Sequence, residues 1–133
     1  MKILIDTNVL ISAFAFGGKP LKLIYRLLLT NHTLIVTSYV VGEFQETVER
    51  KWSTKANELC TRLLKSDFLF LTSADKQYGK LRDKKDVPVL SDAIHYNVDV
   101  ILSGDKDFLE AGLEHPAVKS VSELWDFLGF DNL

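Results

Sequence analysis

The chain has 133 residues, of which 47% are hydrophobic and 26% are charged, a composition that supports one folded domain over residues 1–133 and excludes a largely disordered protein. The formal net charge is only −2, so any contact with nucleic acid must be local. The single cysteine excludes an internal disulfide, and the sequence has neither a secretory signal pattern nor an apolar run of membrane-spanning length. We therefore expect a cytoplasmic protein without a membrane segment.

Strand and helix signals alternate in the first half of the chain. Apolar runs of the kind needed by strands buried on both faces occur at residues 1–5, 34–37 and 68–71. Helices are predicted at residues 9–16, 20–28, 38–51 and 54–65. Gly17 and Gly18 separate the first two helices, and Ser38 is expected to be the N-cap of the third.

The second half resumes this alternation after a polar, charged stretch over residues 73–85. Pro88 suits the first position of a helix that runs to Asn97, because its fixed φ is helical and its missing N–H would have no partner there. Strands are predicted at residues 98–102 and 118–121, and helices begin near residues 106 and 122. Ser120 and Glu123 offer a capping box as an alternative start for the last helix.

Strands that alternate with helices predict an α/β fold, a three-layer α/β/α sandwich with a mainly parallel sheet and right-handed crossovers. In such a sheet the strand ends and the starts of the following helices share one edge, where ligand sites lie. Four acids are placed at this edge: Asp6, Glu43, Asp86 and Asp105. Because carboxylates that lie close together repel one another, this cluster implies a cation.

The donor set of this cluster contains oxygen alone, which favours Mg²⁺ or Mn²⁺ over Zn²⁺. A metal held by few protein ligands keeps bound water, lowers the pKa of that water and stabilises the charge on a phosphodiester under attack. The acids therefore predict phosphodiester hydrolysis.

Residues 6–12 have the sequence DTNVLIS, and residues 102–108 have the sequence LSGDKDF. These two segments resemble the opening and closing motifs, respectively, of the PIN-domain family. Between them, Thr37 and Ser38 followed by Glu43 are similar to the second acidic motif. Residues 82–88 (RDKKDVP) resemble the third-acid region of the toxin (VapC-like) ribonuclease branch. The resemblance spans nearly the whole chain.

The resemblance implies a PIN-like sheet in the order 3-2-1-4-5, dependence on Mg²⁺ or Mn²⁺, endoribonuclease activity and, for the toxin branch, inhibition by a cognate antitoxin protein. It implies that the catalytic, metal-binding acids are Asp6, Glu43, Asp86 and Asp105, with Asp107 as a further metal ligand. Asn8 and Ser103 would lie beside these ligands as hydrogen-bonding partners.

Two residues, Asp86 and Asp92, are candidates for the third acid of the cluster. Lys84 stands where the toxin branch often has proline, and Asp92 offers a second acid shortly after Asp86. We favour Asp86, because it is predicted at the start of a helix whereas Asp92 lies more than one turn inside it.

Two further groups of side chains are candidates for contacts with partners. RNA phosphates could be met by Lys80, Arg82, Lys84, Lys85 and Lys106, although a run of charges is more often a solvated loop. Aromatic residues exceed what one small core needs, so an exposed patch for a second protomer or an antitoxin could include some of Phe14, Phe16, Trp52, Trp125 and Phe130. For each residue taken singly, packing in the core is the favoured alternative. We expect a homodimer or a higher homo-oligomer.

The leading hypothesis is a metal-dependent endoribonuclease that is the toxin component of a toxin–antitoxin system. A general RNA-processing nuclease without an antitoxin is the alternative within the same class. A catalytically idle PIN-like module that binds RNA or protein is disfavoured by the complete set of acids. A phosphoacceptor domain is disfavoured because the sequence shows no convincing arrangement of paired acids, acceptor aspartate and lysine.

Overall fold

The computed structural model describes residues 1–75, 81 and 84–132. Its five strands form one parallel sheet in the order β3-β2-β1-β4-β5. The strands are β1 (Lys2–Ile5), β2 (Thr33–Thr37), β3 (Leu69–Leu71), β4 (Val100–Leu102) and β5 (Ala117–Lys119). The predicted sandwich and its strand order are confirmed.

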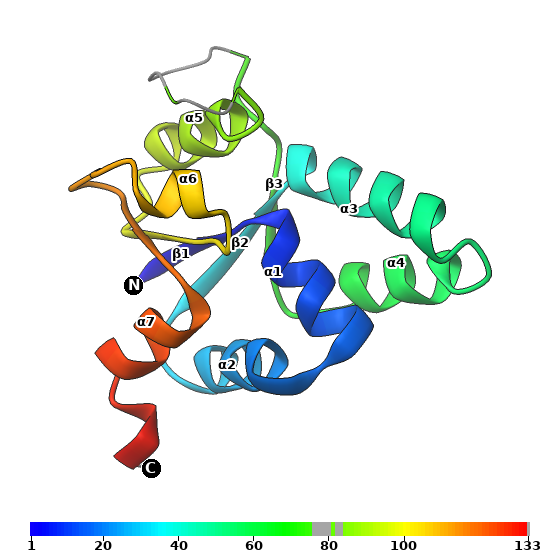
Figure 1. Ribbon diagram of the computed structural model, residues 1–133, viewed down its shortest axis with the longest axis horizontal. Helices are drawn as coiled ribbons and strands as arrows, with labels where there is room; N and C mark the ends of the chain where they lie inside the picture. The colour runs from blue at the N-terminus through cyan, green and yellow to red at the C-terminus, as the bar shows by residue number, and fades with distance from the viewer. Residues whose placement is uncertain (76–80, 82–83, 133) are drawn as a thin grey trace.

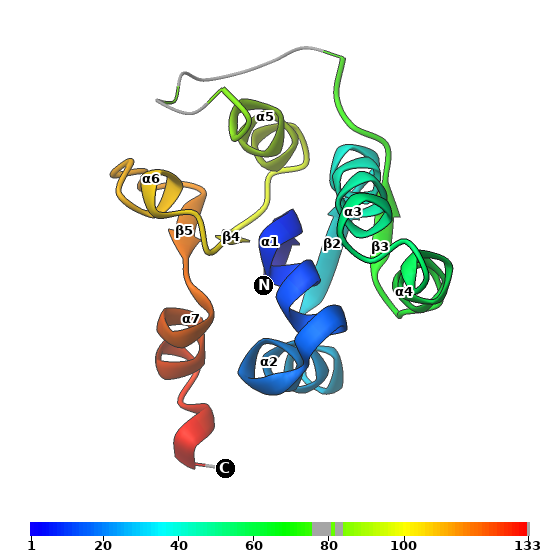
Figure 2. The same cartoon turned by 45° about the vertical axis from the view of Figure 1, so that its right-hand side comes forward.

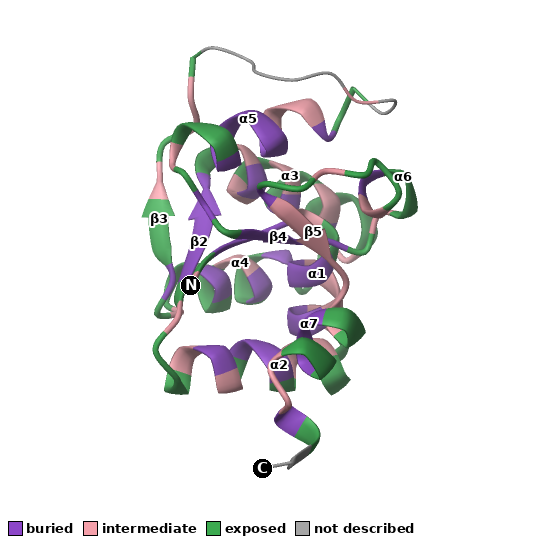
Figure 3. Cartoon of the chain, turned by 90° about the vertical axis from the view of Figure 1, so that its left-hand side faces the viewer, coloured by how far each residue is buried: buried purple, intermediate pink, exposed green. Residues whose placement is uncertain are grey.

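Helices connect the strands and lie on both faces of the sheet (Figure 1). They are α1 (Thr7–Ile11), the π-helix η1 (Ser12–Phe16), α2 (Gly18–Leu29), α3 (Ser38–Lys51), α4 (Ala56–Leu64), α5 (Val87–His95), α6 (Lys106–Leu109), α7 (Val121–Phe127) and the 3₁₀ turn η2 (Phe130–Asn132). Figure 3 shows α5 over one face and α1, α2, α4 and α7 below the other. No helix in the described part of the chain is long and apolar enough to cross a bilayer.

The order of the strands reverses between β1 and β4. From β1 the chain adds β2 and β3 on one side, and then crosses over to add β4 and β5 on the other side. β1 and β4 are paired in register, with Ile5 opposite Leu102. The residues that follow these two strands therefore emerge side by side, at the place where parallel sheets bind ligands.

The three central strands lie in the middle of the core, and their side chains are almost all buried (Figure 3). β3 differs, because Leu69 is 46% exposed and Phe70 is 36% exposed. The expectation of a third strand buried on both faces was therefore wrong. β3 lies at the end of the sheet, and an apolar run alone does not distinguish a central strand from an outer one.

Two helix starts differ from the primary expectations. Thr37, not Ser38, is the N-cap of α3, and the Ser38 hydroxyl accepts a hydrogen bond from the Ser73 backbone N–H at 2.9 Å. A tertiary contact has thus replaced the local cap. α7 begins at Val121 with the capping box of Ser120 and Glu123, as the alternative predicted.

The C-terminal segment packs against α2 (Figure 2). The Arg26 guanidinium donates a hydrogen bond to the Phe130 carbonyl at 2.8 Å and lies 4.5 Å from the centre of the Trp125 ring. Trp125, Phe130 and Phe14 are buried, so these three aromatic residues belong to the core and not to an exposed patch. Phe16, in contrast, is 74% exposed.

Leu27 and Leu29 on α2 provide a matched test of this core. Leu27 is fully buried, whereas Leu29 is 86% exposed. We expect Leu27→Ala to lower the free energy of unfolding by about 2–5 kcal/mol, because it leaves a cavity, and Leu29→Ala to lower it by about 0.5 kcal/mol or less. Urea denaturation measures both values, and equal losses would contradict this packing.

Candidate active site

A pocket of about 480 Å³ lies at the carboxyl ends of β1 and β4. Its lining includes four acids, namely Asp6, Glu43, Asp86 and Asp105. These acids are supplied by the end of β1, the second turn of α3, the residue before α5 and the residue before α6. The fold thus brings together four acids that are widely separated in the sequence.

Asp6 is the most constrained of these acids. It follows β1 directly, is 6% exposed and caps α1, with Oδ1 accepting the Thr7 backbone N–H at 2.8 Å. Its Oδ2 accepts the Ser103 hydroxyl at 2.8 Å. Burial raises the pKa of Asp6 to about 6, and the negative charges of Glu43 and Asp105 add to this rise, whereas the two hydrogen bonds oppose it.

Ser103 joins the two central strand ends. Its hydroxyl donates to Asp6 and accepts the backbone N–H of Asp105 at 3.1 Å. Asp105 in turn caps α6, with Oδ1 accepting the backbone N–H of Asp107 at 2.9 Å. Asn8 makes a parallel connection, because its Oδ1 accepts the Gly104 backbone N–H at 3.0 Å. Ser103 and Asn8 thus lock the loop after β4 against the start of α1.

Glu43 is held by two neighbours that the sequence analysis did not single out. The Thr7 hydroxyl donates to Glu43 Oε1 at 2.8 Å. Tyr39, one turn earlier on α3, has its pKa raised to about 12 by partial burial, by the charge and hydrogen bond of Glu43, and by the charges of Asp6 and Asp86. Tyr39 therefore lies within the electrostatic influence of three of the four acids.

Asp86 and Asp92, the two candidates for the third acid, occupy different surroundings. Asp86 is buried and lines the pocket. Asp92 is buried away from the pocket lining, and its two oxygens accept hydrogen bonds of 2.7 Å from the Ser73 hydroxyl and the Ala74 backbone N–H. Asp92 therefore holds the chain that follows β3 against α5, and Asp86 is the acid that faces the other three.

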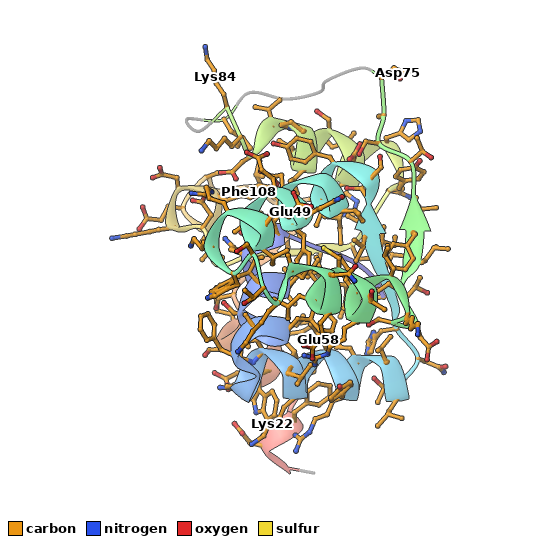
Figure 4. The ribbon with its side chains drawn as sticks, turned by 90° about the vertical axis from the view of Figure 1, so that its right-hand side faces the viewer. Lys22, Glu49, Glu58, Asp75, Lys84 and Phe108 are labelled. Atoms are coloured by element: carbon orange, nitrogen blue, oxygen red, sulfur yellow. The ribbon has the colours of Figure 1, made fainter. Side chains whose placement is uncertain are left out.

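The predicted RNA-contacting cations and the possible further ligand Asp107 differ in whether they reach the pocket. Lys85 lines it, whereas Lys84 is exposed and projects outward (Figure 4). Asp107 and Lys106 are exposed on α6 and are absent from the pocket lining. Lys80 and Arg82 lie outside the described residues.

Arg50 and Lys51 line the pocket but were missed by the sequence analysis. They share a face of α3 with Glu43 and Thr47, at a spacing of four, seven and eight residues. Helical periodicity starting from Glu43 could have found them, because they lie on the polar side of a helix whose apolar side packs into the core.

The site fits a hard divalent cation through the chemistry of its donors. The four acids that line one pocket present carboxylate oxygen, and the charges of Glu43 and Asp105 add to the burial that raises the pKa of Asp6. A bound cation would offset both the cost of burying the Asp6 charge and the repulsion from these neighbours. Among the described histidine, cysteine, aspartate and glutamate side chains, no three are already arranged as a metal site, so ligation by these acids would require them to move closer together.

The raised pKa of Asp6 predicts a pH dependence of stability without metal. Because the folded-state pKa, about 6, exceeds the ordinary value of 3.8, the folded protein binds more protons than the unfolded chain between these values, and stability falls as pH rises through this range. Asp6→Asn removes this effect. In EDTA, the unfolding free energy of Asp6→Asn minus that of wild type should increase by up to about 3 kcal/mol as pH rises from about 4 to 7.

Urea denaturation at the two pH values measures this gain. Asp126→Asn, at an exposed position on α7, is the control and should show almost none of it. A difference between Asp6→Asn and wild type that does not change with pH would contradict the assigned environment of Asp6.

Comparisons with known proteins were consistent with this fold. Solved structures that resemble the chain include VapBC2 from Rickettsia felis, bound to a DNA fragment from its promoter, with a TM-score of 0.71 and 20% identity over 90% of this chain and 98% of the other. They also include VapC20 from Mycobacterium tuberculosis, a toxin that cleaves the sarcin–ricin loop, with a TM-score of 0.62 and 14% identity over 84% of this chain and 95% of the other. At these identities the similarity is one of fold.

No curated protein sequence matches the chain. The sequence profile of the PIN domain matches residues 2–107, a range that contains all four acids of the pocket and four of the five strands. This match covers most of the chain, and we conclude that the protein belongs to the PIN-domain family.

Proposed function

We propose that this protein is a metal-dependent endoribonuclease that hydrolyses RNA phosphodiester bonds. The observation that carries the proposal is the convergence of four carboxylates in one pocket at the ends of β1 and β4. Membership of the PIN-domain family supports it. We further propose that the chain acts as a single domain in the cytoplasm.

Asp6, Glu43, Asp86 and Asp105 are the proposed ligands of Mg²⁺ or Mn²⁺. When bound, the cation supplies positive charge that stabilises a phosphodiester under attack and acidifies water. Asp107 is exposed outside the pocket lining, so it would contribute only if α6 moved inward.

The neighbouring side chains would keep these ligands in position. Ser103 orients Asp6 through its hydroxyl, and Thr7 orients Glu43 in the same way. Arg50 and Lys85 bring positive charge to the same pocket, where they would attract the RNA backbone. This local charge matters because the net charge of the whole chain is slightly negative.

We also propose that the protein is the toxin of a toxin–antitoxin pair. The support is its similarity in fold to VapBC2 and to the toxin VapC20. The proposal implies a cognate antitoxin as partner and includes self-association as a homodimer or a higher homo-oligomer.

Glu43 and Glu46, on the same helix, allow a matched test of catalysis. Glu43 lines the pocket and Glu46 is exposed on α3. We expect Glu43→Gln to reduce Mg²⁺- or Mn²⁺-dependent RNA cleavage at least about a hundredfold, because the loss of one ligand weakens the electrostatic stabilisation of the phosphate. Glu46→Gln should retain wild-type cleavage. Gel analysis of a labelled RNA, with and without EDTA, measures the rate.

Circular dichroism and thermal melting would verify that both glutamine variants fold like wild type. Full cleavage by folded Glu43→Gln, or cleavage that persists in EDTA, would refute the metal-dependent mechanism. Metal binding with no cleavage by the wild-type protein would instead indicate an idle binding module.

The toxin role predicts a growth phenotype. Expression of the wild-type protein in a bacterial host should arrest growth, and Glu43→Gln should relieve the arrest because the cause is RNA cleavage. Co-expression of a small protein with a DNA-binding N-terminus from the neighbouring reading frame should also relieve it. Growth curves and colony counts measure the effect, and normal growth with active, abundant enzyme would favour general RNA processing.

A further inference from the structure

Two aromatic side chains line the same pocket as the four acids. Phe16, at the end of η1, is 74% exposed, and Trp52, the C-cap of α3, is partly buried. Their ring centres are 5.6 Å apart and the rings meet at 80°. Trp52 therefore supports one side of Phe16, while most of the Phe16 surface remains open to solvent. The catalytic chemistry proposed above uses neither ring.

The backbone is shaped to hold Phe16 in this position. η1 is a π-helix, and at its end the Gly17 N–H is shared between the Ser12 carbonyl at 3.1 Å and the Ala13 carbonyl at 2.9 Å. Gly17 then turns the chain with a φ of +78°, a backbone conformation that residues other than glycine rarely adopt. Single π-turns of this kind are rare and occur frequently at functional sites. The turn ends the helix at Phe16 and leaves its ring at the pocket.

Positive charge lies beside the aromatic pair. Arg50 and Lys51, both exposed at the last turn of α3, line the pocket with Phe16 and Trp52. Lys51 Nζ lies 5.9 Å from the centre of the Trp52 ring. An exposed aromatic face bordered by cationic side chains is the combination with which proteins bind single-stranded nucleic acid, because the ring stacks on a base and the cations meet the backbone.

We propose that Phe16 and Trp52, with Arg50 and Lys51, form a subsite that binds one nucleobase of a single-stranded RNA whose phosphodiester is cleaved at the acids. This proposal rests on the proposed nuclease function and specifies its substrate. Since the two rings are nearly perpendicular, one base can stack on only one of them. The exposed Phe16 ring provides the stacking surface, and Trp52 positions it.

The subsite lies toward the far end of α3 from the acids. α3 runs outward from the sheet (Figure 1) and carries Glu43 near its start, with Trp52 just beyond its end. At a rise of about 1.5 Å per residue, Glu43 and Trp52 are separated by about 13 Å along the helix axis. A base that stacks on Phe16 would therefore lie beside the acids, toward the end of α3, and the same RNA strand would continue to the acids.

Single-stranded RNA is the expected substrate because bases inside a duplex are already stacked on one another and cannot reach an exposed ring. A protein partner could also cover an exposed aromatic residue. The cationic border and the shared pocket with the acids favour RNA, and the two occupants make different predictions for binding.

The test measures binding of a labelled single-stranded RNA of about ten nucleotides by fluorescence anisotropy in EDTA, so that no cleavage occurs. Phe16→Leu and Trp52→Leu keep apolar side chains but remove the aromatic rings. We expect each to weaken binding about tenfold, and Trp52→Phe to stay within about twofold of wild type because it restores a ring. Phe127→Leu, at a phenylalanine 63% exposed on α7, is the matched control and should bind like wild type.

Further measurements separate the subsite from the catalytic machinery. With the divalent metal added, the leucine variants should raise KM about tenfold with little change in kcat, and binding of a fully paired RNA should not depend on either ring. Phe16→Leu should fold like wild type, because the Phe16 side chain lies mostly outside the core. A loss of binding in this variant therefore reports on the ring itself.

Wild-type affinity for single-stranded RNA in Phe16→Leu and Trp52→Leu would overturn the subsite while leaving the nuclease intact. Equal losses on single-stranded and duplex RNA would also overturn it, because they would indicate contacts to the backbone alone. So would unchanged RNA binding combined with lost binding of a protein partner. A wild-type protein that neither binds nor cleaves RNA would overturn the proposed function, and the subsite with it.

Discussion

The parallel pairing of β1 with β4 is the constraint on which the whole pocket depends. With Ile5 opposite Leu102, and the Asp6 N–H donating to the Leu102 carbonyl at 2.9 Å, the next residues along the two strands are neighbours. The Ser103 hydroxyl then reaches the Asp6 carboxylate at 2.8 Å. This junction places one acid at the end of β1 and a second just beyond β4, and α3 and α5 bring the other two toward them.

The fold holds these carboxylates against an electrostatic cost. Burial of Asp6 makes the largest contribution to its raised pKa, and the hydrogen bonds from Ser103 and Thr7 offset only part of it. Local hydrogen bonds position the acids without neutralising them. Removal of negative charge from the pocket should therefore stabilise the metal-free protein and impair its proposed chemistry, a conflict between stability and activity that is common at functional sites.

Much of this architecture was predictable because it follows local rules. Apolar runs located the central strands, and the glycine pair after Phe16, together with Pro88, marked helix boundaries. The exposure of β3 and the hydrogen bond of Ser38 to the segment after β3 depend on tertiary neighbours, which no local pattern encodes. The same limit applies to the site. The predicted strand ends located the acids, whereas the hydrogen bond from Thr7 to Glu43 joins residues that are close only in the folded chain.

The outer strand β3 has a consequence for how the protein behaves in solution. Within the described part of the chain, β3 pairs only with β2, so its other side presents backbone N–H and C=O groups without a strand partner. Its sequence, LFL, contains neither the lysine nor the proline that commonly protects such strands. Its length of three residues is then the feature that limits pairing of this edge with a second chain, and Leu69→Lys would be a rational choice for adding a charge to it.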